Sequence, residues 1–313
     1  MVHHVAQQNG ISVNEIRTTD RVIIPARDEG GTITATLNYV LHTGFTAPQV
    51  VVVDSCSQDD TVLRTKAVGV TNIVSQTNVF RDVTSVLDAY GLDVDRALGK
   101  GAALWSGIRW LHNGRLPDDA RVFFLDADIR DIEAIDPLGH LLLGWQTCPE
   151  ASVVKLAQIG KNSEGIIATL NVLRSPYKRL AQFIWPLCGQ QAFRFGTLRR
   201  LRFTTGYSVE MALLFGLIEQ EPLCTLCEVD LRIPLMDERR SEAERVAMFT
   251  SILLFVHSVT RRGGLCALTE THVAAYNRSG RVFAAHLPQA EGGTRGEQVP
   301  ADGILPSMDE LGA

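Results

Sequence analysis

The most constraining feature of this sequence is a series of short apolar runs separated by helical patterns. Residues 21–25, 49–53 and 121–125 are such runs, and helical patterns at 33–41 and 102–112 lie between them. The near-continuous valines of the second run indicate a strand buried on both faces, as in a parallel sheet. Alternation of strand and helix is typical of βαβ units. The sequence therefore predicts an α/β fold with a doubly wound, mostly parallel sheet flanked by helices.

Two carboxylates follow the third run, in Asp126-Ala127-Asp128. Right-handed crossovers place the carboxyl ends of parallel strands along one edge of the sheet, where ligands commonly bind. Carboxylates two residues apart can ligate a hard divalent cation such as Mg²⁺ or Mn²⁺, and the ion can neutralise a departing diphosphate. A solvated loop is the alternative, because this triplet alone is common by chance.

Polar residues also follow the second run. Asp54 can accept hydrogen bonds from a ribose or a base, and Ser55 can donate one. Helix capping accounts for most of the following Asp59-Asp60-Thr61, so the ligand interpretation is kept for Asp54 and Ser55. Lys100 lies between two glycines at the start of a helix, where backbone amides and a cation can approach a phosphate. The sequence contains neither the phosphate-loop nor the dinucleotide-binding glycine pattern.

Glu210 begins an apolar helix. A carboxylate there can be structural, through its interaction with the helix dipole. A catalytic role is the competing interpretation, and the residues alone favour neither.

Composition excludes some partners and locations. The 30 Lys and Arg against 35 Asp and Glu give a net charge of −5, which argues against nucleic acid and anionic membranes as partners. Six cysteines in 313 residues are too few for a disulfide scaffold. Residues 1–20 are polar and are expected to be a tail without a signal peptide, and the apolar stretch 246–256 is too short to span a bilayer. We expect a cytoplasmic protein with a disordered tail at 285–313.

Several segments resemble the nucleotide-sugar half of GT-A glycosyltransferases, in one collinear order. These segments are residues 25–29, 53–61, 99–101 and 126–128. Residues 186–190 and 206–210 narrow the resemblance to the family of glucosyl-3-phosphoglycerate synthases, which are retaining enzymes. The resemblance covers residues 21–255.

The resemblance implies a GT-A type fold in which residues 21–130 bind the nucleotide sugar. Residues 131–284 would form the acceptor-binding half of the same domain, with a C-terminal helical extension on the acceptor side. It also implies transfer of a sugar from a UDP-glucose-like donor to a small hydroxylated acceptor, with retention and with Mg²⁺ or Mn²⁺. The implied catalytic residues are Asp128 and Glu210, and the implied acceptor-binding residues are Arg174 and Tyr207. The implied donor-binding residues are Pro25, Ala26, Glu29, Asp54, Ser55, Lys100, Asp126, Ala127, Gly189 and Gln190.

The sequence departs from this family at three places. The family's third metal ligand, a histidine, has no counterpart in residues 234–240, where Asp237 is the candidate to join Asp126 and Asp128. The basic residue that holds the phosphorylated acceptor falls at Asn171, so that Arg174 or Lys178 would have to replace it. Gln190 stands where relatives have Glu or Ser, which bears on the choice of sugar.

These departures keep alternatives open. A nucleotide-sugar-binding protein with weak or lost catalysis is the first. Nucleotidyl transfer is the second, although residues 27–31 fit a triphosphate-binding loop only loosely. The resemblance favours UDP over GDP, and the acceptor is left unassigned. The apolar stretch 246–256 would serve either as a homodimer interface or as core.

Overall fold

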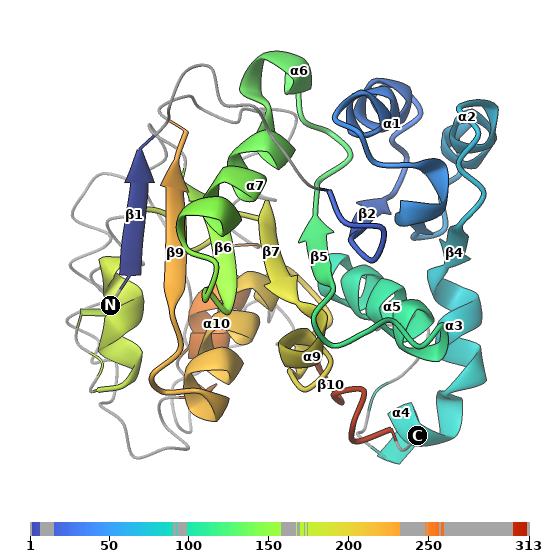
Figure 1. Ribbon diagram of the computed structural model, residues 1–313. Coiled ribbons are helices and arrows are strands. Elements are labelled where there is room, and N and C mark those ends of the chain that lie inside the picture. The colour runs from blue at the N-terminus through green and yellow to red at the C-terminus, as the bar shows by residue number, and fades with distance from the viewer. Residues whose placement is uncertain are drawn as a thin grey trace.

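The protein was analysed as a computed structural model that describes residues 2–6, 16–89, 92, 99–157, 167, 170–171, 173, 175–231, 248, 250–256, 258–259 and 303–311. Its centre is an eight-stranded sheet with the order β1-β9-β6-β7-β5-β2-β3-β4 (Figure 1). The strands of this sheet are β1 (Val2–Ala6), β2 (Arg21–Ala26), β3 (Val50–Asp54), β4 (Ile73–Ser75), β5 (Arg121–Phe124), β6 (Val153–Ala157), β7 (Gln191–Arg194) and β9 (Leu226–Asp230).

Strand β7 is the antiparallel member of this sheet. It pairs antiparallel with β5 and with β6, whereas the other neighbouring strands run parallel to one another. The predicted doubly wound, mostly parallel sheet is confirmed. The reversal has a consequence for the site, because residues that precede β7 lie at the same edge as residues that follow β5.

Helices cover both faces of the sheet. Successive valines of β3 point to opposite faces, so that Val50 and Val52 join one apolar cluster and Val51 and Val53 the other. The first cluster includes α1 (Ile33–His42), α6 (Ile132–Ile135) and α7 (Pro137–Thr147), and α2 (Thr61–Ala67) packs beside α1. The second includes α3 (Gln76–Asp82), α4 (Thr84–Ala89), α5 (Lys100–Asn113), α9 (Phe195–Leu198) and α10 (Val209–Gln220). Short 3₁₀ turns are η1 (Ala47–Gln49) and η2 (Tyr177–Gln182).

Strands lie near both ends of the chain, so the expectation of tails is wrong for residues 2–6 and 303–311, while residues 7–15 and 285–302 lie outside the described residues. Strand β1 pairs with β9 at the edge of the sheet, and Val2 and Val5 are buried. Near the other end, β10 (Ile304–Leu305) pairs with β8 (Phe203–Thr204), and Met308 is buried. The expectation rested on the polar or Gly-rich composition of these segments. Two or three apolar side chains are nevertheless enough for a short strand to pair with an existing edge strand.

Residues 251–256 are helical, and Ile252 and Val256 lie in the apolar core, which favours core over interface for that part of 246–256. None of the described helices is long and apolar enough to cross a membrane.

A buried ion pair joins the segment before β2 to the start of β5. Asp20 is fully buried, and its Oδ2 lies 2.5 Å from Nη2 of Arg121. The same carboxylate accepts from the backbone N–H of Arg17 at 2.8 Å and from Nε of Arg121 at 3.1 Å. These contacts fix the segment before β2 against the first residue of β5.

Replacing Asp20 with asparagine is expected to destabilise the fold by about 3–5 kcal/mol, because the guanidinium of Arg121 would stay buried without its counter-charge. Urea unfolding of Asp20→Asn measures this loss. Asp60→Asn is the matched control, since it removes the half-exposed ion pair with Arg64 and is expected to cost about 0.5 kcal/mol. Equal losses in the two variants would contradict the assignment.

Candidate active site

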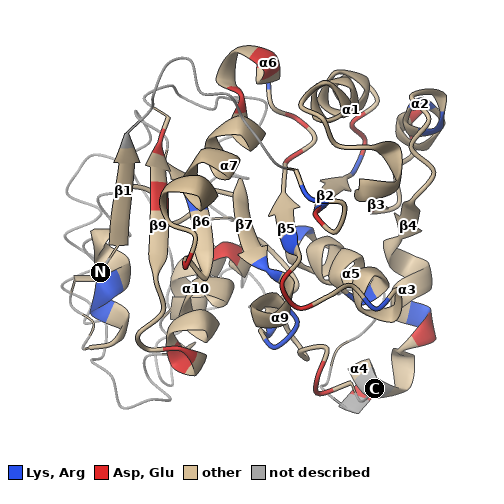
Figure 2. Ribbon diagram, viewed as in Figure 1, with Lys and Arg blue, Asp and Glu red and all other residues tan. Residues whose placement is uncertain are grey.

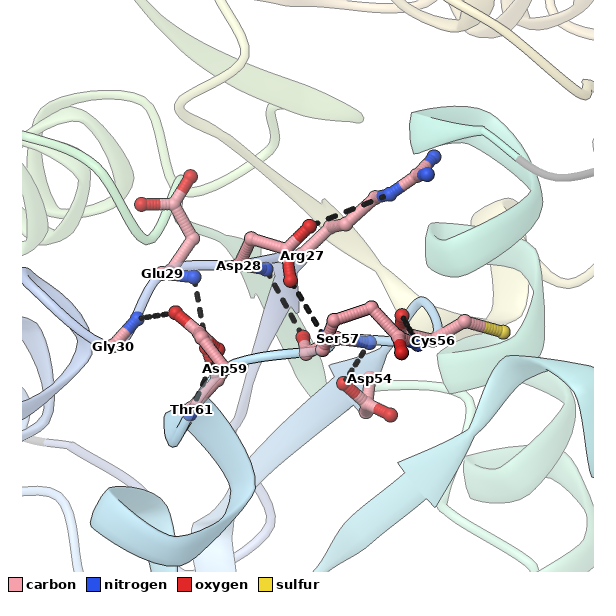
Figure 3. Close-up of polar contacts among 10 residues, drawn as sticks. Arg27, Asp28, Glu29, Gly30, Asp54, Cys56, Ser57, Asp59 and Thr61 are labelled. Carbon is pink, nitrogen blue, oxygen red and sulfur yellow. Dashed lines mark hydrogen bonds and ion pairs between the residues drawn. The ribbon is translucent and has the colours of Figure 1, made fainter.

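The loops after β2 and β3 are tied together by their own polar groups. The backbone N–H of Asp28 donates to Oγ of Ser57 at 3.1 Å, and that of Gly30 donates to Oδ2 of Asp59 at 2.8 Å (Figure 3). Asp59 also accepts from the N–H of Thr61 at 2.9 Å, at the start of α2. Asp59 thus has a structural role, although the N-cap of α2 is Asp60, whose side chain makes no cap hydrogen bond. The two loops form one rigid rim at the carboxyl edge of the sheet.

The expected donor residues of this rim lie next to one another. Ala26 and Asp54 are register partners at the ends of β2 and β3, and Pro25 pairs with Val53. The N–H of Ser55 donates to the carbonyl of Ala26 at 2.9 Å, and Oδ1 of Asp54 accepts from the N–H of Ser57 at 3.1 Å. Glu29 is half-buried, and its Oε2 accepts from the hydroxyl of Thr32 at 2.8 Å.

Lys100 bridges two carboxylates from distant parts of the chain. Its Nζ lies 2.7 Å from Oδ1 of Asp126, after β5, and 2.9 Å from Oε1 of Glu210, in the first turn of α10. Burial would lower the pKa of Lys100, but the two carboxylates outweigh it and raise the pKa above its ordinary value. Lys100 is therefore a fixed cation at neutral pH. The structure thus brings together three residues that sequence analysis singled out separately.

The backbone amides beside Lys100 have a different use from the one expected. The N–H of Gly101 donates to the carbonyl of Gly206 at 3.2 Å, and that of Ala102 donates to the carbonyl of Thr205 at 3.0 Å. An added Cβ at Gly101 would overlap the carbonyl of Thr204. The N–H groups of Gly101 and Ala102 are thus used within the protein, and phosphate binding by the amides of Gly99 and Lys100 stays a prediction. The glycine permits close backbone approach, which ties α5 to the residues before Glu210.

Gln190 and Gly189 reach the same carboxylate from the other side. Nε2 of Gln190 donates to Oδ2 of Asp126 at 2.8 Å. A Cβ at Gly189 would overlap Nζ of Lys100 and would lie 2.7 Å from Oδ2 of Asp126, so only glycine fits there without a shift. Both oxygens of Asp126 are thus engaged by protein groups.

The remaining predicted residues divide into two groups. Ala127 is buried, Asp128 is half-buried directly after it, and Tyr207 is 40% exposed three residues before Glu210. Arg174 and Asp237 lie outside the described residues. Within the part of the chain that the structure describes, no three His, Cys, Asp or Glu side chains cluster as a metal site would require.

Two buried charged residues near this site escaped the sequence analysis. Lys155 in β6 is fully buried, and its Nζ donates to the carbonyl of Cys188 at 2.8 Å and to Oε1 of Gln191 at 2.5 Å. Glu228 in β9 is also fully buried. A single charged residue within an apolar strand could have identified them from the sequence, because charged side chains are almost never fully buried unless they are paired.

Burial lowers the pKa of Lys155 from 10.5 to about 8. Between these pH values the unfolded chain binds more protons than the folded chain, so this residue makes stability rise with pH, by about 3 kcal/mol in total. Urea unfolding between pH 7.5 and pH 10 tests this for wild type and Lys155→Met. The wild type is expected to gain stability over this range relative to the variant. Parallel stability curves would show that the pKa is not lowered.

Comparison with known proteins gives the class of this fold. The arrangement is of the GT-A type, because solved structures with that fold match it over most of the chain. The particular protein it resembles is glucosyl-3-phosphoglycerate synthase, as the sequence motifs indicated. A glucosyl-3-phosphoglycerate synthase from Petrotoga mobilis is 26% identical over 242 residues, which cover 72% of this chain and 68% of that protein. No protein-family model matches the chain.

Solved structures of glucosyl-3-phosphoglycerate synthase from Mycobacterium tuberculosis carry the fold assignment. The one with Mn²⁺, UDP and phosphoglyceric acid has a TM-score of 0.66 at 24% identity, over 82% of this chain and 85% of that one. Another, with Mn²⁺, UDP-glucose and phosphoglyceric acid, has a TM-score of 0.66 at 20% identity over 99% of each chain.

Proposed function

We propose that this chain transfers a hexose from a UDP-glucose-like donor to a small hydroxylated acceptor that carries a phosphate, with retention. The observation that carries the proposal is the Lys100 bridge, which joins Asp126 of the expected donor half to Glu210 of the expected acceptor half. A group-transfer enzyme must hold two substrates across such a junction. The bound nucleotide sugars and phosphorylated acceptors of the similar M. tuberculosis structures support this choice.

The Lys100 ammonium is the group that meets the departing diphosphate. Two of its three N–H donors reach Asp126 and Glu210, and the third would donate to a ligand oxygen. A fixed cation stabilises negative charge as the bond from the sugar to the phosphate breaks, and it needs no rearrangement to do so. Gln190 and Gly189, which contact the same carboxylate from the other side, would face the sugar.

Of the three predicted metal ligands, Asp126 is already engaged by protein groups. Carboxylate oxygens suit Mg²⁺ and Mn²⁺, but both oxygens of Asp126 bond Lys100 and Gln190. Asp128, which the resemblance implies as a metal ligand, would hold the ion together with the diphosphate and Asp237. When bound, the ion would offset the charge of the diphosphate.

Glu210 would orient the acceptor rather than act as a committed base. Its carboxylate is buried and ion-paired with Lys100, so it is held in place to accept a hydrogen bond from the acceptor hydroxyl. The acceptor hydroxyl would attack from the face that the phosphate leaves, and the departing phosphate oxygen would take its proton. Tyr207 and Arg174 would line the acceptor side. The cytoplasmic location and the homodimer stay predictions from the sequence.

Calorimetric titration of UDP and GDP, with and without Mn²⁺, tests the donor site. UDP is expected to bind more tightly than GDP, and Mn²⁺ to tighten UDP binding by about tenfold or more, which is ~1.4 kcal/mol. Asp128→Ala should abolish that gain and leave the metal-free affinity close to wild type. Binding that ignores Mn²⁺ would contradict the metal assignment, and binding of neither nucleotide would contradict the donor site.

Removing either partner of the bridge should reduce transfer sharply. Lys100→Met and Glu210→Gln are each expected to lower kcat by about 10²–10³-fold, since each removes a preorganised charged contact. The assay is release of UDP from UDP-glucose in the presence of phosphoglyceric acid. Lys66→Met removes an exposed lysine of α2 and serves as the control, with turnover unchanged. Wild-type turnover in folded Lys100→Met would exclude the bridge from the reaction.

A further inference from the structure

On one face of the sheet, a row of polar residues runs across strands β1, β9, β6 and β7, next to a row in which every residue is apolar. Val2, Leu226, Val153 and Phe193 are successive register partners on β1, β9, β6 and β7, and all are buried in one apolar cluster. The next row on the same face, two residues along each strand, is entirely polar. The polar row consists of His4, Glu228, Lys155 and Gln191.

Neighbouring members of the polar row interact. Nδ1 of His4 lies 3.3 Å from Oε2 of Glu228, and Nζ of Lys155 donates to Oε1 of Gln191 at 2.5 Å. Lys155 and Glu228 are register partners of opposite charge, and each lies in the electrostatic field of the other. Acidic residues stand out on β9 among mostly uncharged strands (Figure 2).

The polar row holds the backbone of the segment 183–190, which leads into β7. Glu228 accepts from the N–H of Ile184 at 2.7 Å and from that of Trp185 at 2.9 Å. Lys155 donates to the carbonyl of Cys188 at 2.8 Å. Irregular backbone has no ladder to satisfy its polar groups when it is buried, so side chains must do so. The two buried charges thus hold Ile184, Trp185 and Cys188, while the carbonyl of Gln190 accepts from the N–H of Leu156 in β6 at 3.1 Å.

The anchored segment ends at the candidate active site. Sγ of Cys188 donates to Oε1 of Gln190 at 3.2 Å, and Nε2 of Gln190 donates to Asp126, which holds Lys100. Burial raises the pKa of the Cys188 thiol to about 11, so it remains a donor at neutral pH. A continuous set of contacts therefore runs from Lys155 and Glu228 to the Lys100 bridge.

Stability alone does not explain two buried charges in this row. Burial lowers the pKa of Lys155 and raises that of Glu228, so for each residue folding disfavours the charged form. Well-packed apolar residues in place of a buried ion pair are often neutral or stabilising. The other row on this face shows that these strands accept apolar side chains.

We propose that Lys155 and Glu228 are positioning residues of the transfer site, which hold segment 183–190 so that Gln190 fixes Asp126 and, through it, Lys100. This inference rests on the proposed function. Neither residue needs to touch the donor or the acceptor. They fix the positions of the residues that contact the substrates.

The test uses Lys155→Met, Glu228→Gln and the double variant, with Val154→Ala as the control. Val154 is buried next to Lys155 but on the opposite face, so its truncation destabilises β6 without touching the polar row. The measurements are kcat and KM for UDP-glucose, urea unfolding, and deuterium exchange of the amides of Ile184 and Trp185.

We expect kcat to fall by about 10²-fold in both single variants, as for a small misplacement of reacting groups, while KM for UDP-glucose changes much less. The double variant should regain stability relative to the single variants, because no lone buried charge remains, but should not regain turnover. Val154→Ala should lose stability and keep kcat. The two amides should lose protection in Glu228→Gln and in the double variant.

Wild-type kcat in the folded double variant would overturn the proposal, as would a kcat that tracks stability across all four variants. If the wild-type chain transfers no sugar, the proposed function fails instead, and amide exchange then decides the anchoring by itself. Unchanged protection of Ile184 and Trp185 in Glu228→Gln would overturn it.

Discussion

The reversal of strand β7 is the constraint on which the site depends. In a wholly parallel sheet the residues before a strand lie at the opposite edge from the residues after its neighbour. Because β7 runs antiparallel between β5 and β6, Gly189 and Gln190 arrive at the edge where β5 ends. The contact between Gln190 and Asp126 follows from that geometry. One sheet thereby serves both the expected donor half and the expected acceptor half.

Charge then fixes what the topology brings together. Lys100, Asp126 and Glu210 come from α5, the loop after β5 and α10, and the ammonium lies within 3 Å of both carboxylates. The backbone bonds of Gly101 and Ala102 to Gly206 and Thr205 tie the same two helix starts together. Gly99 and Gly101 at this junction permit the backbones of the two segments to approach closely. Side-chain charge and backbone packing thus maintain one arrangement, a condition for preorganised electrostatic catalysis.

Sequence reasoning succeeded where local patterns decide the structure. The valine-rich run that became β3 and the helix after Gly99 follow from apolar periodicity, and the acidic residues at strand ends mark the edge. Register between strands distant in sequence has no local signature, so the polar row and the β7 reversal could not be predicted. The strand β1 was missed because it is stabilised by its neighbour β9, not by its own composition. Lys155 could have been singled out from the sequence, because it is a lysine inside an apolar strand.

The most direct test of the account is to follow the sugar itself. Wild-type protein with Mn²⁺, UDP-glucose and phosphoglyceric acid would be monitored by NMR of the anomeric proton and by mass spectrometry. The account predicts a glucosylated acceptor in the α configuration of the donor, together with one UDP for each glucose transferred. A β-configured product would contradict retention. Tight UDP binding with no product from any phosphorylated hydroxy acid would contradict the transfer function and favour a nucleotide-sugar-binding protein.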